Sequence, residues 1–217
     1  MSVNPAVPPA VALLLGALAL TACGPASSTA SATSEAARVS GTDGYAYRHP
    51  CSEGQLSVRV TRRAGEPAQR VIAVRNTGTN ACGLSLHPRV TLDETASEDM
   101  SRIVRPLVPC GLDAASPGTS PDWPPLPCRK GAPPAYPLGA GRIAYAVIDL
   151  DPSHGSSLVT RGVDELNLLP DGDHMSDARM LNIPLGKGSP VLRPKLGQYR
   201  GTVADAAASM RTAHLRS

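Results

Sequence analysis

Cysteine is the residue type whose spacing restricts the chemistry of this chain most. The sequence has five, at Cys23, Cys51, Cys82, Cys110 and Cys128. No two of them have C-x-x-C spacing, which argues against thioredoxin-like redox chemistry and against a zinc ribbon. Cys23 follows an apolar leader, and the other four fit two disulfides with three possible connectivities. We favour Cys51–Cys82 with Cys110–Cys128, because each bridge then closes a local loop.

A second group of candidate residues is acidic. Asp171, Asp173 and Asp177 flank His174 on a predicted loop. Hard oxygen ligands at such spacing could hold Ca²⁺ weakly, although the segment lacks the glycine and terminal glutamate of an EF-hand loop. The alternative interpretation is a solvated acidic turn, which we favour. The sequence therefore predicts no cofactor.

Two aromatic residues form a third candidate site. Trp123 and Tyr136 lie among prolines and could form an exposed stacking platform for a sugar or a peptide. Such rings also pack simply against proline side chains. Both interpretations stay open from the sequence.

Three motifs resemble catalytic signatures only in part. Gly139–Ala144 satisfies G-x-G-x-x-A, but prolines precede it and a strand pattern follows, whereas a dinucleotide loop leaves a strand and opens a helix. Gly83–His87 lacks the second glycine of a hydrolase nucleophile elbow. Asp149–His154 offers Asp, Ser and His, but neighbours in one short segment rarely converge as a triad. We therefore predict that the chain is not an enzyme.

The N-terminus has the pattern of a lipoprotein leader. Ala10–Leu20 is an apolar run too short to span a bilayer, and Leu20-Thr21-Ala22-Cys23 looks like a bacterial lipobox. This predicts a signal peptide over residues 1–22 and acyl chains on Cys23 that insert into a membrane. Residues 23–45 then form a flexible tether reaching roughly 25 Å. A plain secreted protein cut near Ala22, or a retained hydrophobic N-terminus, is the alternative.

Composition narrows the class of the remaining chain. The 217 residues include Gly 20 and Pro 22, a net charge of +3, 3% aromatic residues and no Phe. Such a chain favours strands and loops, and it lacks the basic, aromatic character of a nucleic-acid-binding face. Collagen and coiled coil are excluded as well. We expect one domain over residues 46–200.

Short alternating segments predict a β-sandwich for this domain. Residues 106–137 contain ten prolines and predict a long loop that needs its disulfide. Residues 201–217 form either a short C-terminal helix, started by a capping box at Thr202 and Asp205, or a frayed tail. The strands are expected at 55–61, 70–75, 83–92, 142–150, 165–169, 179–183 and 191–193.

Several short motifs in these strands carry a family resemblance. The positions are Cys51, Leu56, Val58, Asn76, Gly78, Cys82, Leu84, Pro88, Val90 and Leu92, followed by Gly141, Ala144, Ala146 and Ile148. Together they resemble a domain of unknown function that is widespread in actinobacterial secreted proteins and lipoproteins. The resemblance implies an all-β, immunoglobulin-like β-sandwich outside the cytoplasm. It implies no catalytic residues.

These observations predict a lipid-anchored protein on the extracytoplasmic face of the cell membrane. We expect a non-catalytic binding or scaffolding module whose partners are the membrane, through the anchor, and an unknown envelope protein or glycan, with no nucleic acid. The second hypothesis is a carbohydrate- or peptide-binding module that uses the loop of Trp123 and Tyr136. The third is an envelope hydrolase, against which the incomplete motifs argue.

Overall fold

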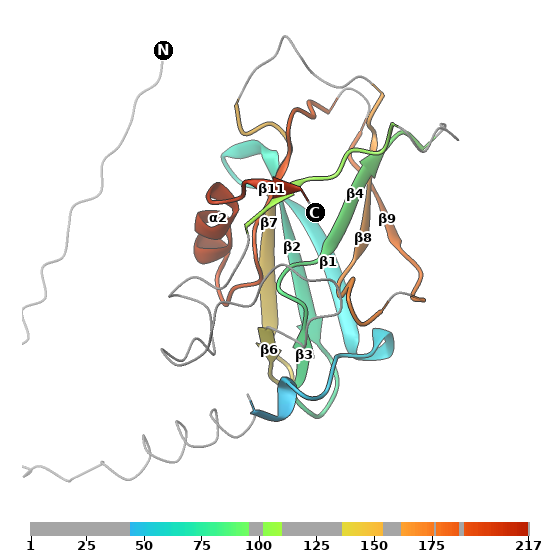
Figure 1. Cartoon of the computed structure of the whole chain (residues 1–217), viewed down its shortest axis with the longest axis vertical. Coiled ribbons are helices and arrows are strands. Elements are labelled where there is room, and N and C mark those ends of the chain that lie inside the picture. The colour runs from blue at the N-terminus through green and yellow to red at the C-terminus, as the bar shows by residue number, and fades with distance from the viewer. Residues whose placement is uncertain are drawn as a thin grey trace, which may run out of the picture.

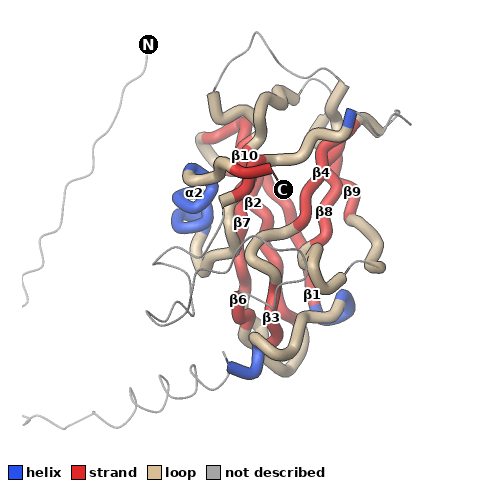
Figure 2. Tube along the Cα trace, viewed as in Figure 1, coloured by secondary structure: helices blue, strands red, loops and turns tan. Residues whose placement is uncertain are grey.

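The computed structural model describes residues 44–95, 102–109, 136–153, 162–175, 177–186 and 189–216. Figures 1 and 2 show a fold dominated by strands, with helix α2 (Val203–Arg211) on one side. The largest sheet has six strands in the order β1 (Leu56–Arg63), β2 (Glu66–Asn76), β7 (Ile143–Asp149), β10 (Lys195–Leu196), β5 (Leu107–Val108) and β11 (Leu215–Arg216). The smaller sheets are β4 (Arg89–Asp93), β8 (Glu165–Leu169) and β9 (Leu181–Pro184), and β3 (Cys82–Leu84) with β6 (Tyr136–Leu138).

The long hairpin of β1 and β2 forms one end of the six-stranded sheet. Alternating apolar residues put Val58 opposite Val74, and Val74 in turn lies opposite Ala144 of β7. A tight turn joins the two strands, and Gly65 supplies its positive φ of 77°. A short 3-10 helix, Glu53–Gln55, leads into β1.

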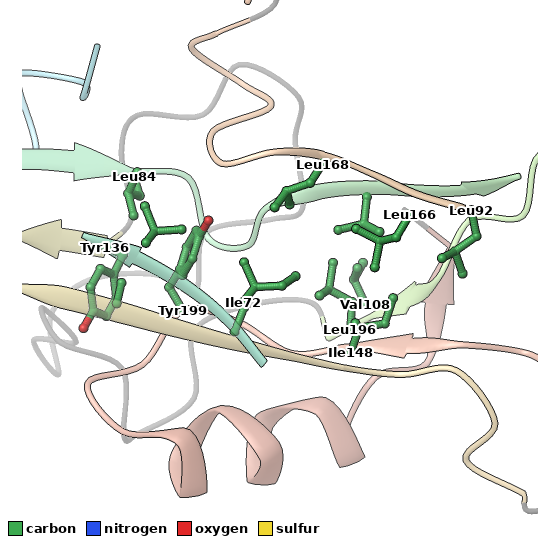
Figure 3. Close-up of a cluster of buried hydrophobic side chains, with 14 of the residues drawn as sticks. Ile72, Leu84, Leu92, Val108, Tyr136, Ile148, Leu166, Leu168, Leu196 and Tyr199 are labelled. Carbon is green, nitrogen blue, oxygen red and sulfur yellow. The ribbon is translucent and has the colours of Figure 1, made fainter. Parts of the chain in front are cut away.

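The hydrophobic core lies between the six-stranded sheet and the sheet β4-β8-β9. Ile72 and Ile148 face it from one side, and Leu92, Leu166 and Leu168 face it from the other (Figure 3). All five side chains are fully buried. Because period-2 strands present one apolar face each, two sheets can bury both faces against one another.

Helix α2 covers part of the opposite face of the six-stranded sheet. Ala206 and Met210 pack there against Val147 of β7 and Val71 of β2. Gly197 permits this close approach, since a Cβ atom at that position would lie 2.4 Å from the carbonyl oxygen of Ala206. The predicted short C-terminal helix is therefore confirmed at Val203–Arg211, where it packs on the domain, whereas Leu215–Arg216 form the strand β11.

The predicted all-β class is confirmed, and several strand boundaries differ from the prediction. The predicted strand 165–169 matches β8, whereas 83–92 is two strands, β3 and β4, in different sheets. The break falls at 85–88, where the Ser85 hydroxyl donates to the carbonyl of His87 and Pro88 has no N–H to offer a ladder. The strand expected at 191–193 is also wrong, since β10 starts at Lys195 after Arg193 adopts a positive φ of 49°.

The segment predicted as one long loop, 106–137, contains β5 near its start and the beginning of β6 at its end. Residues 110–135 lie outside the described residues. No helix within the described ranges has the length and apolar character needed to cross a membrane.

Candidate functional site

The first predicted pairing of cysteines is confirmed. Cys51 and Cys82 form a disulfide with an S–S distance of 2.01 Å, and it joins the segment before β1 to β3. Both residues are buried. The other predicted cysteines, Cys23, Cys110 and Cys128, lie outside the described residues, as does Trp123.

Tyr136 does not form an exposed platform. It lies in β6 opposite Leu84, is 7% exposed, and its ring centroid lies 6.0 Å from that of Tyr199 in the core. The prediction of surface exposure is wrong for this residue because strand pairing with β3 draws it inward. Tyr136 is therefore a packing residue, and a stacking surface at this position would require the core to open.

The predicted acidic loop is built around one buried carboxylate. Asp171 is 0% exposed and accepts hydrogen bonds from the backbone N–H groups of Asp173 and His174, at 3.3 and 3.2 Å. The His174 Nδ1 atom lies 2.9 Å from the same carboxylate. Asp177 is exposed. Within the described ranges no group of three or more Asp, Glu, His or Cys side chains is placed to hold a metal ion.

The other motifs with catalytic residue types have local structural partners. Gly141 has a φ of 71° in the turn that enters β7, as expected for a turn followed by a strand. The Ser153 hydroxyl donates to Asp151, and Asp149 accepts from the side-chain amide of Gln69 at 2.9 Å. His154 lies outside the described residues. The polar groups of these segments fix turns and strand ends.

The feature best suited to binding is the outer edge of β1. Thr77 N–H donates to the carbonyl of Gln55, and the register pairs Leu56 with Asn76, so hydrogen-bonded pairs between β1 and β2 fall at odd residues of β1. The backbone groups of the even residues therefore point away from β2. The Asn76 N–H group agrees with this alternation. Asn76 lies opposite the even residue Leu56, and its N–H group donates to the backbone carbonyl of Arg142, which precedes β7, rather than to β1.

Val58 and Val60 consequently direct their N–H and C=O groups outward from the sheet. Within the part of the chain that the structure describes, these groups have no hydrogen-bond partner, and β1 pairs only with β2. Leu56 differs, since its N–H group donates to the carbonyl of Glu53. An unpaired strand edge of this kind is a template for another extended chain.

The side chains of β1 add apolar surface beside these open backbone groups. Leu56, Val58 and Val60 are half-buried and pack against the core from the edge position. Added cover beside them would bury their remaining apolar surface. The edge therefore offers both backbone hydrogen bonds and hydrophobic contact to a partner.

Positive charge surrounds the same edge. Arg59 and Arg62 are exposed, and neither has a hydrogen-bond or ion-pair partner among the described residues. Arg62 lies opposite Arg70. Burial lowers the pKa of the Arg70 guanidinium, and the nearby charge of Arg62 lowers it further. This crowding of like charges would be relieved by an acidic neighbour.

Sequence reasoning predicted the strand 55–61 but not its edge position. Strand order depends on pairings between residues far apart in the chain, which the local alternation does not encode. One signal was present: three arginines within eight residues of a strand are typical of an edge strand that is protected by charge.

Comparisons with protein-family models, curated proteins and solved structures find no match to this chain.

Proposed function

We propose that this chain is a lipid-anchored protein on the extracytoplasmic face of a cell membrane, and that its domain binds an envelope protein without catalysing a reaction. The lipobox-like Leu20-Thr21-Ala22-Cys23 supports the anchor. The Cys51–Cys82 disulfide supports an oxidising compartment outside the cytoplasm. The family resemblance and an immunoglobulin-like arrangement of the two main sheets belong to the same proposal, supported by the core that these sheets share.

The open edge of β1 carries the binding proposal. An extended segment that adds to it as a further strand gains hydrogen bonds from Val58 and Val60 and covers the apolar side of the edge. Arg59 and Arg62 select for acidic residues in that segment. The same arginines oppose pairing of two copies through β1, because such a pair brings like charges together.

A peptide-binding measurement tests this proposal. The probes are two synthetic peptides, one alternating valine with glutamate and one alternating valine with lysine, titrated into the full chain. We expect the glutamate peptide to bind and the lysine peptide not to bind, since only the first complements the arginines. Equal binding of the two peptides, or no binding by either, would contradict the proposal.

Two variants locate the binding site on β1. Val60→Pro removes one outward N–H group and leaves the ladder to β2 intact, so it should weaken binding of the glutamate peptide about tenfold. Arg59→Glu should weaken it at least as much by charge reversal. Arg211→Glu, at an exposed position on α2, is the matched charge control and should bind like the parent protein. Thermal unfolding of each variant verifies that the fold is retained.

The anchor has its own test. Cys23→Ser should move the protein out of the membrane fraction of the producing cell, because the acylated thiol is lost. Retention of this variant in the membrane fraction would contradict lipid anchoring at Cys23.

A further inference from the structure

One end of the domain collects exposed side chains that suit a membrane surface. Three exposed large hydrophobic residues are found in the described ranges, namely Tyr45, Ile143 and Leu181, at 41, 37 and 41% exposure. Tyr45 lies next to Gly44, where the described chain begins, and Ile143 is the first residue of β7. Two of the three exposed hydrophobic residues therefore belong to segments near the point where the proposed tether would join the domain.

Backbone contacts place these segments at the same end. The carbonyl of His49 accepts from Gly83, and Gly83 lies opposite Pro137 in the pairing of β3 with β6. The Asn76 side chain donates to the carbonyl of Leu138, and the Asn76 N–H group donates to that of Arg142. A continuous set of contacts thus connects residues 44–50 with the end of β2 and the start of β7.

Arginines accompany the two hydrophobic residues. Arg48, Arg75 and Arg142 are exposed at this end, and Arg75 lies opposite Ile143. None of the three guanidinium groups has an ion-pair partner among the described residues. Asp43 and Glu53 are the acidic residues nearest to Arg48 in the chain, so the three arginines outnumber the carboxylates of these segments.

We infer that this end, defined by Tyr45, Arg48, Arg75, Arg142 and Ile143, docks on the headgroups of anionic phospholipids in the membrane that holds the anchor. The inference rests on the lipid anchor of the proposed function. Arginine attracts an anionic surface, and tyrosine and isoleucine insert at the level of the headgroups, as in interfacial membrane sites. The proposed tether over residues 23–45 joins the described domain at this same end, so the anchor and the docking surface would face the membrane together.

Docking orients the rest of the molecule. With this end on the membrane, the hairpin turn at Gly65 points away from the membrane, since β1 runs from Leu56 at the docking end to Arg63 at the far end (Figure 1). The strand β1 then runs away from the membrane surface, and its open edge remains accessible to a partner.

Vesicle binding by the full chain carrying Cys23→Ser tests the inference. Without the acyl chains, binding is compared between vesicles of phosphatidylcholine and vesicles that also contain phosphatidylglycerol. The leader contains no Lys or Arg, so a preference for the anionic vesicles must come from other residues. We expect such a preference, and it should decline as salt is raised.

Two triple variants locate the surface. Replacing Arg48, Arg75 and Arg142 by glutamine should weaken binding to the anionic vesicles by about a hundredfold, at roughly fivefold for each arginine. The matched control replaces the exposed Arg105, Arg193 and Arg211 by glutamine, with the same change in charge, and should bind like the parent.

Equal binding to the two vesicle types, or equal weakening by the two triple variants, would overturn the inference. Neither outcome affects the anchor, because Cys23 is replaced throughout this experiment. A lost anchor would instead appear in the cell-fractionation test, so the two failures are distinguishable.

Discussion

The hydroxyl of Tyr199 donates a 2.8 Å hydrogen bond to the backbone carbonyl of Pro170 inside the core. Tyr199 is fully buried, and its ring lies beside that of Tyr136. The bond ties the strand region after β10 to the loop after β8. It also gives the buried Pro170 carbonyl a hydrogen-bond donor inside the protein.

Tyr199→Phe should destabilise the domain by about 1 to 3 kcal/mol, because the Pro170 carbonyl is then left without its donor. Urea unfolding at neutral pH measures this change. Tyr145→Phe, at a half-buried tyrosine of β7, provides a comparison for the general cost of removing a hydroxyl. An unchanged free energy of unfolding in Tyr199→Phe would show that the hydrogen bond contributes nothing net.

The same residue predicts a pH dependence. Burial raises the pKa of Tyr199 well above 10.0, and the charge of Asp171 raises it further. Above pH 10 the unfolded chain releases this proton while the folded domain retains it, so stability falls as pH rises. Tyr199→Phe should lose this contribution, which is at most about 1.4 kcal/mol per pH unit. Parallel slopes of parent and variant at alkaline pH would contradict the assignment.

Loss of the Cys51–Cys82 disulfide should reduce stability by about 4 kcal/mol, as the bridge closes a loop with a sequence separation of 31. The measurement is the urea midpoint of the Cys51→Ser, Cys82→Ser double variant against the parent under non-reducing conditions. Any further shift of the urea midpoint when dithiothreitol is added to the double variant measures the stability that any other disulfide contributes. Identical midpoints of parent and double variant would contradict the prediction.

Gly197→Ala should disturb the packing of α2 on the sheet. The added Cβ atom would lie 2.4 Å from the carbonyl oxygen of Ala206 and 2.8 Å from the backbone nitrogen of Met210, both rigid groups. We expect a loss of about 1 to 3 kcal/mol in the free energy of unfolding. Gly54→Ala is the matched control, because its Cβ would meet nothing within 4 Å. Equal effects at both sites would show that the close approach is unimportant.

Thr202→Ala should remove the N-cap of α2. The Thr202 hydroxyl accepts a hydrogen bond from the Asp205 N–H group at 3.1 Å. Loss of such a cap costs about 1 kcal/mol. Thermal unfolding compares it with Thr79→Ala, an exposed threonine without a cap role, which should leave stability unchanged. Restoration of parental stability by Thr202→Ser would support the hydroxyl as the cause.

Local patterns predicted what depends on local chemistry. The alternation of Glu165–Leu169 identified β8, the capping residues at Thr202 identified the start of α2, and the loop length favoured Cys51–Cys82. Long-range pairing decided the rest. Tyr136 stands among prolines and resembles a loop residue, yet it is buried because β6 pairs with β3. The open edge of β1 is likewise a property of strand order, which no single segment determines.

The bridge between Cys51 and Cys82 also has a mechanical consequence. A force applied to the chain before Gly44 reaches Cys51 before it reaches β1. The covalent link transfers that load to β3, where Cys51 and Gly83 are also joined by a backbone hydrogen bond of 2.9 Å. Such a force can therefore straighten residues 44–50, but it cannot separate β1 from β2 starting at Leu56 while the disulfide is intact.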